Sequence, residues 1–149
     1  MNKKIKAYIA VGGTGGHVFP GYHLAKHLIN QDYDVELIID KRGHKYLEKS
    51  SGIKMVILPS SPITNKNFFK IFISSILIFL SILRSTIFLL FNRPSLIIGM
   101  GGYASFPMCV AASILKIKFL IYENNLVIGK ANKYLLPLAD KIFVANKEL

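Results

Sequence analysis

The stretch GGTGGH, residues 12–17, lies between an apolar run, Ile5–Val11, and a segment whose apolar residues have helical spacing, His17–Asn30. A glycine-rich turn from a strand into a helix directs backbone N–H groups and the positive helix end outward, which favours a phosphate. Positive φ angles in a tight turn explain one or two glycines, whereas this turn contains four. No Gly-Lys-Ser/Thr follows, and Val18 occupies the third glycine position of a dinucleotide fingerprint. We therefore expect an anionic ligand here, outside these two nucleotide motifs.

The rest of the chain alternates short apolar runs with helical segments, which predicts a parallel sheet covered by helices on both faces. The expected fold class is α/β, a Rossmann-like doubly wound parallel sheet whose ligands gather at the carboxyl ends of the strands. The expected strands are Ile5–Val11, Val35–Asp40, Lys54–Leu58, Leu96–Gly99, Phe119–Tyr122 and Ile142–Ala145, and the expected helices are His17–Asn30, Lys45–Lys49, Phe68–Phe91, Phe106–Leu115 and Gly129–Leu138.

Composition indicates one basic domain. The chain has 149 residues, a formal net charge of +11 and 52 % hydrophobic residues, above the roughly 45–50 % of an ordinary soluble protein. The positive charges are dispersed and no nucleic-acid-reading motif occurs, so we expect an anionic lipid or a phosphorylated substrate rather than nucleic acid. Cys109 is the only cysteine, which excludes an intrachain disulfide and a cysteine-based zinc site and fits a reducing cytoplasm. His23 and His27 have metal-ligand spacing but no third ligand nearby, so we expect them on a solvated face.

The segment Ile71–Phe91 contains one charge, Arg84, in 21 residues. Three interpretations stay open: a helix that spans the bilayer, which needs about 20 apolar residues, a buried crossover helix, and a crossover helix with one face in a membrane surface. We favour the third, in which nearby basic residues meet anionic headgroups. The residues expected to contact the membrane are Ile71, Phe72, Leu77, Phe79 and Leu80, and the basic residues are Lys66, Lys70, Arg84 and Arg93.

Two further loops follow predicted strands. The segment 99–105, GMGGYAS, repeats the glycine-rich pattern before a helix, and two such loops at one sheet edge suggest a diphosphate between two helix N-termini. Glu123 follows another strand, where it is either a ligand-binding carboxylate or a surface side chain. His17 is either a general base, because an imidazole nitrogen can accept a proton from a hydroxyl, or a histidine that caps the helix or contacts phosphate.

Three motifs, in this order and spacing, resemble the N-terminal half of the MurG family: GGTGGHVFPGYHLAKHL (12–28), GMGGYASFP (99–107) and YENNLVIGKANKYL (122–135). The resemblance covers essentially the whole chain. It implies the GT-B architecture of two Rossmann-like domains, with residues 1–149 as the N-terminal, acceptor-binding domain and the C-terminal UDP-sugar domain absent. It also implies transfer of N-acetylglucosamine from UDP-N-acetylglucosamine to the 4-hydroxyl of the muramic acid sugar of lipid I. This reaction inverts the anomeric carbon and completes lipid II in peptidoglycan synthesis.

The resemblance further implies roles for single residues. His17 and Glu123 are the candidate catalytic residues, His17 as general base and Glu123 as an acceptor-contacting or base-orienting group. The family's third motif usually reads His-Glu-Gln-Asn, so Tyr122 and Asn124 depart from it. No cofactor and no metal are expected, because helix dipoles can supply part of the positive potential near the departing diphosphate. The residues implied to bind substrate are Gly13, Thr14, Gly15, Gly16, Gly101, Gly102, Tyr103 and Asn125, and Gly129 and Asn132 also match the family.

The partners that the resemblance implies are UDP-N-acetylglucosamine, lipid I (an undecaprenyl-diphosphate-linked muramyl peptide) and an anionic membrane surface on the cytoplasmic side of a bacterial membrane. A separate C-terminal donor domain is a further expected partner, and the chain alone is expected to bind acceptor without turnover. One alternative is a non-catalytic, membrane-associated subunit of a split GT-B transferase that recruits a donor-binding chain. A nicotinamide-dependent oxidoreductase is disfavoured, since Asp40 lies beyond the roughly 20 residues expected for a ribose-binding acid.

Overall fold

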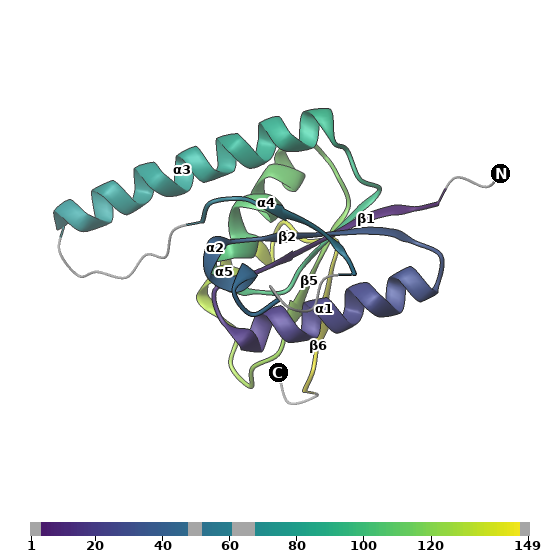
Figure 1. The fold of residues 1–149 in the computed structure, drawn as a ribbon. Helices are drawn as coiled ribbons and strands as arrows, with labels where there is room; N and C mark the ends of the chain where they lie inside the picture. The colour runs from purple at the N-terminus through teal and green to yellow at the C-terminus, as the bar shows by residue number, and fades with distance from the viewer. Residues whose placement is uncertain (1–3, 48–51, 61–67, 147–149) are drawn as a thin grey trace.

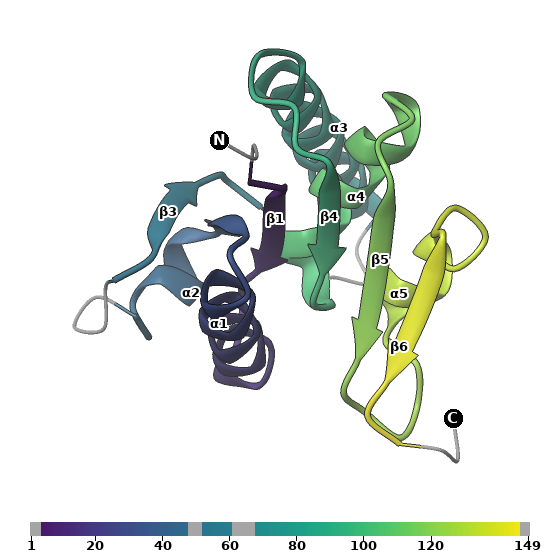
Figure 2. The same cartoon turned by 90° about the vertical axis from the view of Figure 1, so that its right-hand side faces the viewer.

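The computed structural model describes residues 4–47, 52–60 and 68–146. Six strands form one sheet in the order β3-β2-β1-β4-β5-β6, and every neighbouring pair is parallel. The carboxyl ends of the strands therefore lie at one edge of the sheet, and Figure 2 shows the arrowheads of β4, β5 and β6 pointing toward it. The strands are β1 (Lys6–Val11), β2 (Asp34–Ile39), β3 (Lys54–Ile57), β4 (Leu96–Gly99), β5 (Phe119–Glu123) and β6 (Lys141–Val144).

Helices cover both faces of the sheet. Figure 1 shows the layers in order, with α3 (Phe68–Phe91) outermost, α4 (Gly102–Ile114) between α3 and the sheet, and α1 (Gly15–Asn30) on the opposite face. Alternate residues of β1 enter the two cores, Ala7, Ile9 and Val11 on the α1 side and Tyr8 and Ala10 on the α4 side. The doubly wound parallel sheet predicted from the sequence is therefore confirmed. The two short helices are α2 (Lys41–His44) and α5 (Lys130–Leu135).

The structure corrects several element boundaries. The helix predicted at Lys45–Lys49 is wrong for its described part, because α2 comes before it and residues 45–47 form a turn; residues 48–49 lie outside the described residues. Helix α4 begins at Gly102, four residues before the predicted Phe106. Pro137 follows α5, which ends at Leu135 and not at the predicted Leu138. Strand β6 lies at the sheet edge with all of its residues exposed.

Helix α3 has the bounds predicted from the sequence. Ser81 and Ser85 face inward, while most of its large apolar side chains are exposed. Its described residues form one helix long and apolar enough to cross a membrane, Phe69–Phe91. Among their side chains only Ser81, Ser85 and Leu89 are buried. The interpretation of a buried crossover helix is therefore wrong. All five residues expected to contact a membrane are exposed, by 39–65 %, and the N-terminal turns of α3 project beyond the sheet (Figure 1).

Candidate functional site

The first glycine loop leads from β1 into α1, and its conformation requires glycine at two positions. Gly12 and Gly13 have φ angles of +152° and +78°, which other residues rarely adopt. A Cβ atom on Gly12 would lie 2.5 Å from the Cβ atom of Ala104 and 2.6 Å from Oδ1 of Asp40. Thr14 precedes the first turn of α1, and its side chain does not cap the helix. The positive end of α1 is therefore directed at the carboxyl edge of the sheet.

Packing does not explain all four glycines of this loop. A Cβ atom on Gly15 would lie 3.1 Å from the ring of Phe19, which is 46 % exposed. A Cβ atom on Gly16 would find no neighbour nearer than Oγ1 of Thr14, at 3.8 Å. Gly16 is also exposed and helical, where glycine is less favourable than alanine. The absence of a side chain at Gly16 is consistent with close approach of a ligand to the backbone.

The second glycine loop lies directly beside the first. Gly101 and Gly102 have φ angles of +86° and +74° and begin α4. The imidazole of His17 packs against both, since a Cβ atom would lie 3.2 Å from its Cε1 atom at Gly101 and 3.1 Å from its Cδ2 atom at Gly102. Within the described residues, Nδ1 of His17 is buried and has no hydrogen-bond partner. The two loops predicted to share a sheet edge thus do so, with His17 between them.

Glu123 is the last residue of β5, and its side chain is buried at 1 % exposure. The interpretation of Glu123 as a surface side chain is therefore wrong. Oε1 accepts hydrogen bonds from the backbone N–H and side-chain amide of Asn125, at 3.0 and 2.7 Å, while Oε2 accepts from Gly129 N at 2.8 Å and Asn132 Nδ2 at 3.0 Å. Burial raises the pKa of Glu123, but these donors outweigh burial and hold the pKa below its usual value. This carboxylate organises the β5–α5 loop.

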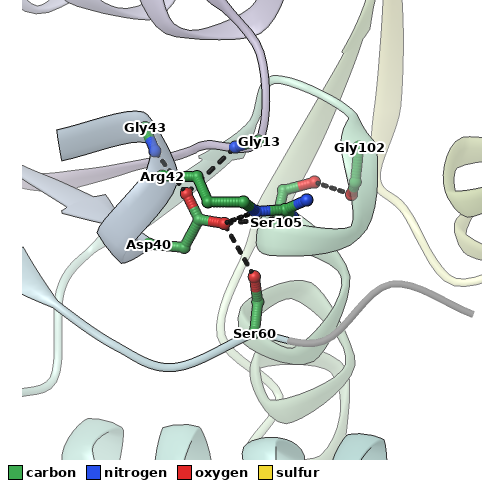
Figure 3. A network of polar contacts seen from close by, with 7 residues as sticks. All are labelled: Gly13, Asp40, Arg42, Gly43, Ser60, Gly102 and Ser105. Atoms are coloured by element: carbon green, nitrogen blue, oxygen red, sulfur yellow. Dashed lines mark hydrogen bonds and ion pairs between the residues drawn. The ribbon is translucent and has the colours of Figure 1, made fainter. Parts of the chain in front are cut away.

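Asp40 performs the same task for the first glycine loop (Figure 3). Its buried carboxylate accepts from the backbone N–H groups of Gly13, at 3.0 Å, and Gly43, at 2.8 Å. It also accepts from Ser60 Oγ at 3.1 Å and pairs with Arg42 at 3.3 Å. Burial raises the pKa of Asp40, and these hydrogen bonds and the guanidinium lower it overall. Sequence reasoning missed this role, although an Asp before a short helix is an N-cap signal.

A pocket of about 180 Å³ opens where the second glycine loop meets the β5–α5 loop. It brings together five of the predicted site residues, whereas Gly13, Thr14, Gly15, Gly16 and Gly101 lie beside it without lining it. Lys130 lines the pocket and was not predicted. Neither His23 nor His27 reaches it, and the described residues contain no group of three or more His, Cys, Asp or Glu side chains that could hold a metal. The lining residues are His17, Gly102, Tyr103, Glu123, Asn125, Gly129, Lys130 and Ala131.

Comparison with known proteins supports the motif resemblance. The chain is 41 % identical over 149 residues to a UDP-N-acetylglucosamine–N-acetylmuramyl-(pentapeptide) pyrophosphoryl-undecaprenol N-acetylglucosamine transferase of Pelagibacter ubique, covering all of this chain and 40 % of the relative. A Wolbachia protein of the same name is 39 % identical over 94 % of this chain and 38 % of its own length. The chain thus spans about 40 % of the length of these curated relatives.

Solved structures share the fold. The crystal structure of Acinetobacter baumannii MurG superposes with a TM-score of 0.78 at 24 % identity, covering 99 % of this chain and 42 % of that one. A putative UDP-N-acetylglucosamine 2-epimerase from Listeria monocytogenes superposes with a TM-score of 0.68 at 14 % identity, over 98 % of this chain and 40 % of that one. The model of the glycosyltransferase family 28 N-terminal domain matches residues 7–144. The chain therefore belongs to glycosyltransferase family 28, and nearly all of it corresponds to that family's N-terminal domain.

Proposed function

We propose that this chain forms the acceptor-binding half of an inverting transferase that moves N-acetylglucosamine from UDP-N-acetylglucosamine to lipid I in peptidoglycan synthesis. The observation that carries the proposal is the position of His17 between two glycine loops, beside a pocket lined by Glu123 and Asn125. The names of the curated relatives describe this transfer. In this proposal the donor sugar is supplied by a second domain, which corresponds to the part of the relatives outside the matched region.

In the proposed transfer, the chain must remove one proton from the acceptor hydroxyl and stabilise the negative charge on the departing diphosphate. Nδ1 of His17 is buried, so we assign Nε2 as the atom that takes the proton from the acceptor hydroxyl. The hydroxyl oxygen then bonds to the anomeric carbon while the bond to UDP breaks. The N-termini of α1 and α4 converge on this edge and stabilise the diphosphate charge through their dipoles and N–H groups.

Glu123 is assigned a positioning role within this proposal. Its four hydrogen bonds and lowered pKa keep it ionised near neutral pH, and they make it a weak proton acceptor. The same bonds fix the amides of Asn125 and Asn132. Asn132 Nδ2 also lies within 3.4 Å of the position of a Cβ atom on Gly101, so the carboxylate supports the loop on which His17 rests.

We also propose that α3 binds the chain peripherally to the cytoplasmic face of the bacterial membrane. The exposed large apolar side chains of α3 supply the contact area, and Lys70, Arg84 and Arg93 are exposed cations on or beside it. The guanidinium of Arg93 donates to the carbonyl of Leu115 at 2.9 Å, which anchors the end of α3 to α4. Lys66, also predicted to meet headgroups, lies outside the described residues.

A reconstitution assay tests the proposed reaction. The chain is mixed with the part of the Pelagibacter ubique relative outside the matched region, and transfer of labelled N-acetylglucosamine to a vesicle-bound lipid I analogue is measured. We expect transfer by the mixture, none by the chain alone, and loss of transfer in His17→Ala. His23→Ala is the control, because His23 is exposed on α1 and does not line the pocket. Full activity with His17→Ala would favour the non-catalytic subunit, and turnover by the chain alone would contradict the division of roles.

A further inference from the structure

A second pocket of about 220 Å³ lies between α3, α4 and α5. Its walls are predominantly carbon, with three aromatic rings and two aliphatic side chains. No step of the proposed transfer uses it. The lining residues are Ile78 of α3, Tyr103 and Phe106 of α4, and Lys130, Ala131 and Tyr134 of α5.

This apolar pocket adjoins the polar pocket at His17. Tyr103, Lys130 and Ala131 line both, so one short stretch of wall separates them. On its other side the apolar pocket reaches Ile78, whose neighbours Leu77 and Phe79 are exposed by 43 % and 65 %. The order along the surface is therefore polar pocket, Lys130, apolar pocket, and exposed face of α3.

We propose that the apolar pocket takes the first isoprenyl unit of a prenyl diphosphate, with the diphosphate held beside Lys130. This inference rests on the proposed acceptor function and adds a lipid subsite to it. A lipid-linked sugar diphosphate has the same order of parts as the surface: sugar, anion, hydrocarbon. Lys130 supplies the complementary charge at the junction, where a phosphate would lie.

The dimensions suit a short length of hydrocarbon. Pockets for whole small molecules measure about 300–1,000 Å³, so about 220 Å³ accommodates a fragment. A uracil ring could also stack on the aromatic walls, but its polar edge would face mainly carbon. Tyr103, Lys130 and Tyr134 carry the polar side-chain atoms of this lining, and Tyr134 is 71 % exposed. Burying unpaired polar groups is costly, which favours hydrocarbon over a base.

Titration calorimetry with soluble diphosphates of increasing chain length tests the subsite without a membrane. The probes are methyl, dimethylallyl and geranyl diphosphate, each added to the 149-residue chain at low salt. Dimethylallyl diphosphate should bind at least about tenfold more tightly than methyl diphosphate, because each buried methylene is worth roughly fourfold in affinity. The second isoprenyl unit of geranyl diphosphate should add less, because the pocket holds only the first.

Matched variants separate the pocket from the exposed face of α3 and from general charge. Ile78→Ser should reduce the gain from methyl to dimethylallyl diphosphate to about threefold or less, while Phe79→Ser, one residue along and outside the pocket, should keep it. Lys130→Ala should lower the affinity for all three diphosphates by about tenfold, while Lys133→Ala on the same helix should change these affinities little. Circular dichroism confirms that each variant is folded.

Four outcomes overturn the inference. Equal affinity for methyl and prenyl diphosphates leaves the acceptor proposal standing but removes the lipid subsite. Equal losses from Ile78→Ser and Phe79→Ser assign the gain to nonspecific contact with α3. The pocket is assigned to a base if uridine displaces dimethylallyl diphosphate and the Ile78→Ser variant binds uridine less tightly. Absence of binding by all three diphosphates overturns both the subsite and the proposed acceptor function.

Discussion

Replacing Gly16 by alanine is expected to stabilise the fold and weaken ligand binding at the same time. Gly16 is helical and exposed, and an added Cβ atom would find its nearest neighbour at 3.8 Å. Glycine costs about 0.5–1 kcal/mol relative to alanine within a helix, so Gly16→Ala should raise the free energy of unfolding by up to about that amount. For a chain of this size the midpoint of thermal unfolding should rise by about 1–4 °C.

The effect on binding has the opposite sign. If a diphosphate contacts the backbone at Gly16, the added methyl group holds it away and removes one charge-assisted hydrogen bond. Such a bond is worth about 1.5–3 kcal/mol, so affinity for inorganic diphosphate should fall by at least about tenfold. Thermal unfolding by circular dichroism and titration calorimetry on the same sample measure both quantities.

Alanine substitutions at two other glycines serve as controls. Gly52→Ala places its Cβ atom in open space away from the site and should leave binding unchanged. Gly13→Ala also has room, with Arg42 Nη2 nearest at 3.8 Å, but φ is +78°, so it should destabilise the fold by about 1–2 kcal/mol. A loss of stability in Gly16→Ala would refute the reasoning from open space. Increased stability with unchanged affinity would refute the contact with ligand.

Three further predictions concern the rest of the site and α3. Glu123→Gln should lower the free energy of unfolding at pH 7 by about 2–4 kcal/mol, because an amide cannot accept all four hydrogen bonds. The folded pKa of Glu123 lies below the unfolded value of about 4.3. The extra stability of the wild type over Glu123→Gln is therefore present above that pH and declines as the pH falls through the folded pKa. Urea unfolding from pH 7 to pH 3 measures it, and a difference in unfolding free energy that stays constant over this range would contradict the prediction. Gly102→Ala should cost about 1–3 kcal/mol and shift the NMR signals of the His17 imidazole, which an unchanged spectrum would disprove. Phe72→Asp with Phe79→Asp should abolish sedimentation with anionic vesicles while changing the free energy of unfolding by less than about 0.5 kcal/mol; binding equal to wild type would exclude α3 as the membrane contact.

The fold was predictable because its signals are local and repeated. Strand β4 and helix α3 have the bounds predicted from apolar run length, and the alternation of elements implied the parallel sheet. The errors lie where one interaction decides a boundary. Helix α2 begins after Asp40 because that carboxylate accepts from Gly43 N, and α4 begins at Gly102 because Gly101 adopts a φ of +86°. Neither interaction has a periodic signature in the sequence.

The site was predictable to the level of loops but not of side chains. Parallel strands bring their carboxyl ends together, so the meeting of the glycine loops at residues 12–17 and 99–105 followed from topology. The role of Asp40 depends on contacts with Gly13 and Ser60, which are distant in sequence. From the sequence alone, Lys130 is indistinguishable from any exposed helical lysine. Its place in both pockets follows only from the packing of α4 beside α5. The number of glycines suggested a ligand, but only the space around each glycine distinguishes Gly16 from Gly12.

The packing of α3 supports the membrane proposal independently of sequence resemblance. In water, burying a large apolar side chain is worth about 1.5–3 kcal/mol. Yet α3 buries two serines, Ser81 and Ser85, beside Leu89, and exposes Phe72 and Phe79. The hydroxyl of Ser81 donates to the carbonyl of Leu77 at 2.8 Å, so its burial leaves no donor unpaired. A helix that lies in a membrane surface buries its exposed apolar side chains in the lipid, so their exposure in α3 carries no penalty there. With α3 at a membrane surface, the apolar pocket, Lys130 and His17 would follow one another away from the bilayer, in the order that a lipid diphosphate sugar requires.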